Sequence, residues 1–166
     1  MQTVTEGRAT DTDALYLRRA FAIAARSRES GQRPFAALVV RDGEVLAETA
    51  SSRPKGRNAT AHSELRALSA AAELHGPAEL ARATLYASAE PCAMCAGAVY
   101  WSGVGRVVFG LSEASLRRLT GDHPSNPTLN LPCRELFGRG QRSIEVIGPY
   151  LEDEALVPHQ GYWQRP

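Results

Sequence analysis

Two short segments constrain this chain more than any other feature of its sequence. The first contains His62 and Glu64, and the second is Cys92-Ala93-Met94-Cys95, preceded by Pro91. One imidazole and two thiolates are good ligands for Zn²⁺, and a site with three protein ligands leaves the fourth tetrahedral position to water, as in catalytic zinc sites. We therefore predict that the fold brings the two segments together around one zinc ion, bound by His62, Cys92 and Cys95.

The cysteine pair alone has other interpretations. Cys92 and Cys95 could form a redox pair, half of a four-ligand structural zinc site, or two small buried side chains. Cys133 could supply a fourth ligand, but it has no second cysteine at Cys-x-x-Cys spacing, and a buried side chain is the favoured interpretation. A redox pair would leave His62 and Glu64 without a function. The two segments in combination therefore favour a catalytic site.

Length and composition are those of an ordinary soluble protein. The 166 residues suffice for one domain with a hydrophobic core, and we expect 1–166 to form it, with 1–10 as a flexible tail. A net charge of +1 gives no overall basic field, which argues for a small-molecule partner and against nucleic acid. The sequence contains no apolar run long enough to cross a membrane and no signal peptide. Three cysteines, two of them assigned to metal, favour a reducing, cytoplasmic location.

Apolar periodicity and turn residues predict alternating helices and strands. A helix begins near Asp11, with Asp11 or Thr12 as its cap, and it ends at Gly31. Asp42-Gly43 is a strong hairpin signal between two strands. The full set comprises strands at 34–40, 45–50, 82–87, 105–110 and 144–147, helices at 62–74, 92–102, 113–119 and 133–137, and a weakly helical segment at 152–164. This alternation predicts an α/β fold with helices on both faces of one sheet, a three-layer α/β/α sandwich.

The predicted helices place the chemical groups at two helix starts. His62 and Glu64 begin one helix, and Cys92 and Cys95 begin the next, where the positive end of the helix dipole favours thiolates. A zinc-bound hydroxide would act as the nucleophile, and Glu64 would shuttle the proton from water to the substrate. The alternative for Glu64 is a first-turn acid stabilised only by the helix dipole.

From about Leu15 to Leu119 the chain resembles the cytidine and nucleobase deaminase superfamily. The histidine-x-glutamate and proline-cysteine-x-x-cysteine segments carry the resemblance, which is strongest to the guanine deaminase and tRNA adenosine deaminase branch. The resemblance implies a five-stranded mixed sheet between helices, a homodimer, and zinc-dependent hydrolytic removal of an amino group from a base. Guanine is the leading substrate, with tRNA adenosine, cytosine and guanosine as alternatives.

The same resemblance implies roles for residues outside the zinc motif. Asn58 would hydrogen-bond the base, Phe35 and Trp101 would form apolar walls, the Ala61 N–H would hold a substrate carbonyl, and Asp122 would help to move a proton. Each has a simpler interpretation, namely core packing for the aromatic residues and turn formation for Asn58 and Asp122.

Two features stay open at this level. Tyr162 and Trp163 could fold over the pocket or pack on the sheet. A non-enzymatic module, in which zinc only joins two helices, would account for His62, Cys92 and Cys95 but would have no use for Glu64.

Overall fold

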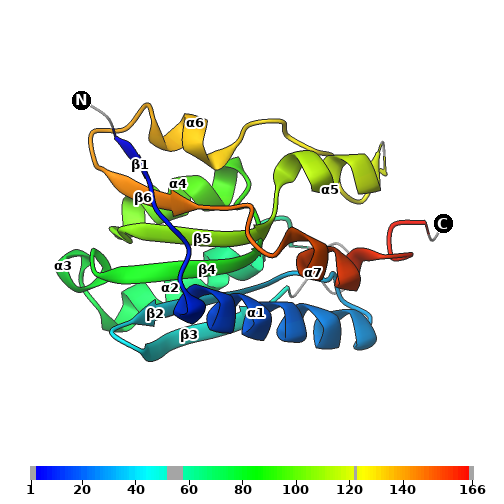
Figure 1. Cartoon of the computed structure of the whole chain (residues 1–166), viewed down its shortest axis with the longest axis horizontal. Coiled ribbons are helices and arrows are strands. Elements are labelled where there is room, and N and C mark those ends of the chain that lie inside the picture. Colours follow the sequence, from blue (N-terminus) through cyan, green and yellow to red (C-terminus); the bar gives the residue numbers. More distant parts are fainter. Residues whose placement is uncertain (1–2, 52–57, 122, 165–166) are drawn as a thin grey trace.

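The computed structural model describes residues 3–51, 58–121 and 123–164, and it centres on one mixed β-sheet. The sheet has six strands in the order β1-β6-β5-β4-β2-β3 (Figure 1). β2 runs antiparallel to β3 and β4, whereas the pairs β4–β5, β5–β6 and β6–β1 are parallel. The strands are β1 (Val4–Glu6), β2 (Ala36–Arg41), β3 (Glu44–Ala50), β4 (Ala83–Ala89), β5 (Arg106–Leu111) and β6 (Ile144–Ile147).

Helices cover both faces of this sheet, which confirms the α/β/α sandwich. α1 and α7 lie on one face, and α2, α3, α4 and α6 lie on the other (Figure 1). Strand side chains alternate between the two cores: Val39 packs with α2 and α4, and Leu38 packs with α1. The helices are α1 (Asp11–Glu29), α2 (Ser63–Leu74), α3 (Pro77–Leu80), α4 (Ala93–Ser102), α5 (Glu113–Thr120), α6 (Cys133–Phe137) and α7 (Glu152–Leu156), followed by the 3₁₀ turn η2 (Val157–His159).

The sixth strand corrects the expected five-stranded sheet and the expected tail. Val4–Glu6 pairs in parallel with β6, with Val4 opposite Ile144. The buried Thr3 hydroxyl also donates to the Phe137 carbonyl at 3.0 Å. A strand of 3 residues is too short to display an alternating pattern in the sequence, so its pairing depends on the free edge that β6 provides.

Capping and turn residues in the sequence predicted the ends of the other helices and strands, and the cap of α1 is the one correction. The cap of α1 is Thr10, whose hydroxyl accepts from the Asp13 N–H while the Asp13 carboxylate accepts from the Thr10 N–H, so the expected cap at Asp11 or Thr12 is wrong. The hairpin turn is confirmed, because Asp42 and Gly43 have φ of 50° and 81°. Among the described residues, none of the helices has the length and apolar character of a membrane span.

Strand directions gather the polar residues at one edge of the sheet. The parallel strands β4 and β5 both end there, and their next residues lead to Glu90 and Glu113. β2 runs the opposite way, so it starts at this edge, directly after Phe35, and β3 ends there, directly before Ser51. The Ser51 N–H donates to the Phe35 carbonyl at 2.9 Å, which joins the two segments. In sheets of this kind the carboxyl ends of the parallel strands are the usual place for a ligand.

Candidate metal centre and catalytic cavity

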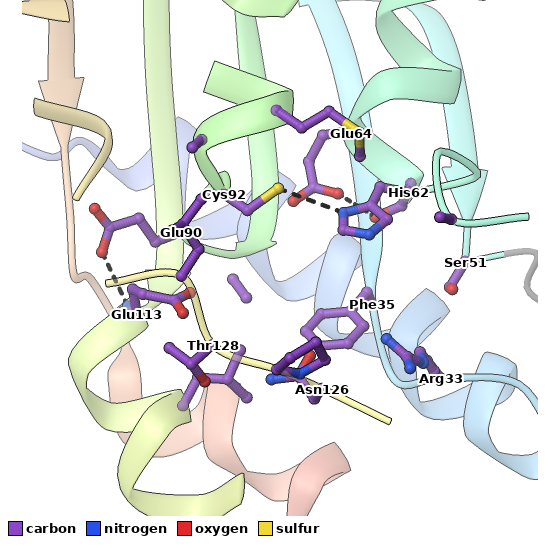
Figure 2. Close-up of a pocket in the computed structure, with 18 residues that line it drawn as sticks. Arg33, Phe35, Ser51, His62, Glu64, Glu90, Cys92, Glu113, Asn126 and Thr128 are labelled. Atoms are coloured by element: carbon purple, nitrogen blue, oxygen red, sulfur yellow. Dashed lines mark hydrogen bonds between the residues drawn. The ribbon is translucent and has the colours of Figure 1, made fainter. Parts of the chain in front are cut away.

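His62, Cys92 and Cys95 converge at the starts of two helices. His62 is the N-cap of α2, Cys92 is the N-cap of α4, and Cys95 lies in the first turn of α4. The Nδ1 atom of His62 is 3.5 Å from the Cys92 Sγ (Figure 2). It is 3.6 Å from the Cys95 Sγ. The three ligand atoms lie within 4.8 Å of one another. One imidazole and two sulfurs at this spacing suit a tetrahedral zinc ion with one position left open.

The protonation of the two thiols also fits a cation. A hydrogen bond from Cys95, together with the nearby His62, lowers the pKa of Cys92 to about 4, against the effect of burial. The same hydrogen bond, together with burial, raises the pKa of Cys95 well above its usual range. The pair therefore shares one proton when it is alone. A divalent cation replaces that proton and lets both sulfurs act as thiolate ligands.

Glu64 lies beside the metal ligands but is not one of them. It is 7% exposed, and its carboxylate accepts a hydrogen bond from the Ser63 hydroxyl at 2.9 Å. Burial raises the pKa of Glu64, and the nearby Cys92 raises it further. A carboxyl group whose protonated form is stabilised in this way is suited to take up and release a proton.

These groups face one cavity of about 310 Å³ (Figure 2). His62 and Glu64 lie on one side of it, and Cys92, Glu90 and Glu113 lie on another, with Phe35 and Arg33 on the wall formed by the segment before β2. The segment from 126 to 129 forms a further wall (Figure 2). The volume is at the small end of the ~300–1,000 Å³ typical of ligand pockets.

Two of the expected substrate residues lie outside this cavity. Trp101 is 83% exposed and makes an edge contact with Tyr100, because it belongs to the last turn of α4, whereas the site is at the first. The Asn58 side-chain oxygen accepts from the N–H and the hydroxyl of Thr60, at 3.0 and 2.9 Å. It thus forms a local Asx turn. Neither side chain lines the cavity of this chain, and the substrate roles of Asn58 and Trp101 stay predictions.

Of the other predicted substrate residues that the structure describes, only Phe35 lies at the cavity. Phe35 lines the cavity, as expected. The Ala61 N–H donates to the Asn58 carbonyl at 3.3 Å, and Ala61 lines a separate depression with Asn58; its role in binding a substrate carbonyl stays a prediction. Asp122 lies outside the described residues.

Cys133 and the C-terminal aromatic residues take supporting positions. Cys133 is fully buried and is not one of the three metal-ligand residues, and its N–H donates to the Glu90 carboxylate at 2.9 Å. Trp163 is buried behind Phe35, with ring centroids 6.0 Å apart. Trp163 therefore packs in the core on the α1 side of the sheet and supports the cavity wall from outside.

Several lining residues were not singled out from the sequence, among them Arg33, Ser51, Glu90, Glu113 and Asn126. For Ser51, Glu90 and Glu113 a usable signal existed. Each is a polar residue within three positions of the end of a predicted strand, and the strand directions place those ends at one edge. Arg33 and Asn126 lie in loops, for which no such rule applies.

A mixed sheet whose edge holds two thiols, an imidazole and a buried glutamate beside one cavity defines a zinc-dependent hydrolase. Residues 10–111 match the family described as "Cytidine and deoxycytidylate deaminase zinc-binding region". The chain belongs to this family, which confirms the resemblance derived from its two motifs, and it is a zinc-dependent deaminase.

Individual relatives act on different compounds. A protein of Schizosaccharomyces pombe named probable cytosine deaminase is 39% identical over 154 residues, which cover 93% of this chain and 94% of the relative. A tRNA-specific adenosine deaminase of Bacillus subtilis is 34% identical over 142 residues, 86% of this chain and 83% of the relative. The structure also resembles a mutant of the protein NE0047 in complex with 8-azaguanine, with a TM-score of 0.76 and 28% identity over 92% of this chain and 84% of that one.

Proposed function

We propose that this deaminase acts on a free nucleobase. The observation that supports this best is the joint position of His62, Cys92 and Glu64 on one cavity of about 310 Å³ whose walls include Phe35, Leu116 and the 126–129 segment. Such a cavity suits a single planar heterocycle. A base within a polynucleotide needs a wider approach for the attached backbone.

The chain's own residues account for the proton movements of hydrolytic deamination. His62, Cys92 and Cys95 would hold the zinc ion, which supplies a Lewis acid that brings the pKa of water near neutrality. Glu64 would accept a proton from the attacking water and deliver it to the ring nitrogen, and would then carry the proton of the newly added hydroxyl to the departing amino group as the carbonyl forms. Ser63 holds the Glu64 carboxylate in place through its hydroxyl. Phe35 would pack against the base, and the aromatic layer behind it, which includes Trp163, keeps that wall fixed.

Cytosine is the first candidate substrate and guanine the second. The relative named as a cytosine deaminase covers almost the whole chain. Guanine is supported by the resemblance of the zinc motifs and by the neighbour that binds 8-azaguanine. Asn58 and Trp101, two residues behind the initial preference for guanine, do not line the cavity of this chain, and we therefore rank guanine second.

Ammonia release from a panel of compounds tests the proposal. The purified protein is incubated with cytosine, guanine, adenine, guanosine and an RNA stem-loop that carries adenosine in its loop. We expect turnover of a free base, with cytosine ahead of guanine. Deamination of the RNA alone, or of none of these compounds, would contradict the proposal.

We also propose a homodimer in a reducing, cytoplasmic setting. The resemblance of the zinc motifs to the deaminase superfamily supports the dimer, and Trp101, a large apolar side chain that is 83% exposed on α4, is the residue that we assign to its interface. The described cysteines are all free thiols, as the metal site requires. Sedimentation analysis of wild type and Trp101→Arg tests the dimer, since the variant should sediment as a monomer.

A further inference from the structure

Glu113 is a buried carboxyl group in the cavity that the reaction described above does not use. It is the first residue of α5 and is 9% exposed, so its side chain is about nine-tenths buried. The side chain lies on the wall formed by Cys92, Glu90 and Thr128, away from His62 and Glu64 (Figure 2). Within the described part of the chain, no hydrogen bond or ion pair is made by its carboxyl group.

The backbone of Glu113 is held firmly, so the direction of the side chain is fixed. Its N–H donates to the Glu90 carboxylate at 2.9 Å. The preceding residue, Ser112, donates from its N–H and its hydroxyl to Glu152, at 2.9 and 2.7 Å, and accepts from the Ser115 N–H at 3.1 Å. Ser112 is therefore the cap of α5, and the Glu113 carboxyl group is not needed for that purpose.

The surroundings of this carboxyl group define what it can bind. Burial and the neighbouring Glu90, Cys92 and Glu64 together raise the pKa of Glu113 to about 7. The ionised form of the carboxyl group only accepts hydrogen bonds, so an N–H donor from a ligand in the cavity would pair with it. A hydrogen bond to a charged group is stronger than one between neutral groups.

We infer that Glu113 determines specificity in this deaminase by accepting a hydrogen bond from a ring N–H of a free base. The inference rests on the proposed function. In a free base the nitrogen that carries the sugar in a nucleoside still bears a hydrogen, so it can donate to Glu113. In a nucleoside, a nucleotide or an N-alkylated base that donor is replaced by carbon, and Glu113 would face an apolar group at close range. The enzyme would therefore prefer free bases to nucleosides.

The test combines variants of Glu113 with substrates that differ in this one donor. Wild type, Glu113→Ala and Glu113→Gln are assayed with cytosine and 1-methylcytosine and with guanine and 9-methylguanine. Glu29→Ala, a change of an exposed glutamate on α1, is the control. Zinc content and the thermal midpoint are measured for every variant, so that a folding defect is recognised.

We expect Glu113→Ala to lower kcat/KM for the base that carries the N–H on the order of 10- to 100-fold, the usual loss for a hydrogen bond to an ionisable group. The loss should appear mainly in KM, because this ring nitrogen does not react. Activity on the methylated base should be low in wild type and unchanged in the variant. Glu113→Gln keeps an acceptor oxygen and should retain activity within about 3-fold, since it loses only charge assistance.

Other outcomes separate the two claims. If wild type deaminates a free base and Glu113→Ala does so equally well, Glu113 does not determine specificity, and the proposed function stands. A loss of zinc in Glu113→Ala, or an equal loss of activity on both members of a substrate pair, would assign Glu113 a structural role and overturn the inference. Wild type that is active on RNA and inactive on every free base would overturn both claims.

Discussion

At the residue scale, two buried carboxyl groups share one cavity but face different chemistry. Glu64 adjoins the metal ligands and has the Ser63 hydroxyl as partner, whereas Glu113 lies on another wall without a side-chain partner among the described residues. Environment, rather than residue type, separates their functions. Glu64 is placed to transfer protons, and Glu113 is placed to accept a hydrogen bond from an N–H group of the substrate.

Glu64→Gln should abolish most of the turnover and leave the fold and the zinc content intact. Glutamine preserves the size and one acceptor oxygen but cannot carry a proton, so we expect a fall in kcat of about 10²- to 10⁴-fold. Glu73→Gln, an exposed change on the same helix, is the matched control for α2. The measurement is ammonia release together with metal analysis. Turnover within a few-fold of wild type would remove Glu64 from the reaction.

The stability of Glu113→Gln should depend on pH differently from that of wild type. The pKa of Glu113 is about 7 in the folded protein, raised by burial from an ordinary value of 4.5. Between these values the folded state binds more protons than the unfolded state, so wild type loses stability as pH rises from 4.5 to about 7. The variant cannot ionise at this position, so it does not lose stability over this pH range. Its melting temperature should exceed that of wild type at pH 8, and the difference between the two melting temperatures should be smaller at pH 5. Equal differences at both pH values would contradict the shift.

At the element scale, the sequence predicted the elements that have strong local signals and failed where long-range pairing decides. The helix starts at His62 and Cys92, the Asp42-Gly43 turn and the buried strands β4 and β5 follow from periodicity and turn chemistry. β1 does not, because its pairing with β6 joins residues far apart in the chain.

The candidate site divides in the same way. The zinc ligands and Glu64 could be predicted because their spacing is set within two helix starts. Trp101 does not line the cavity of this chain, because identity and spacing along a helix do not say which end of it meets the cavity. The Asn58 side chain does not line it either, because a local turn competes for its side-chain oxygen. Glu113 required the order and direction of the strands.

The C-terminal end of α4, the helix that carries both cysteines, is held by one arginine. Its C-terminal carbonyls are bound by Arg142, whose guanidinium donates to Val99, Tyr100, Gly103 and Val104 at 2.9–3.2 Å. Arg142→Met removes these donors from a helix end, so we expect a loss of about 1–3 kcal/mol in the free energy of unfolding. Arg139→Met, at an exposed position nearby, should be neutral. Denaturant unfolding measures both, and equal stability of the two variants would contradict this role for Arg142.

At the scale of the whole molecule, the metal site links two helices, α2 and α4, that pack in the same hydrophobic core. α2 contributes His62 at its N-cap, and α4 contributes Cys92 at its N-cap and Cys95 in its first turn. The inner faces of the two helices, with Leu68 and Val99, pack in the same hydrophobic cluster against the sheet. Because the unfolded chain does not hold these ligands together, zinc binds the folded state only. Zinc binding should therefore stabilise both helices and the sheet together, and not a single loop.

Removal of zinc should lower the thermal midpoint of the entire domain. If free zinc exceeds its dissociation constant about 1,000-fold, binding stabilises the folded state by ~4 kcal/mol, which corresponds to a shift on the order of 10 °C for a chain of this size. Cys92→Ala removes one ligand, so its midpoint should be low and unchanged by a chelator. Cys133→Ala is the matched control, because Cys133 is buried but is not one of the three ligand residues, and its response to the chelator should match that of wild type. Melting curves with and without chelator measure all three proteins. A response that persists in Cys92→Ala, or disappears in Cys133→Ala, would show that the metal is held by a different set of residues.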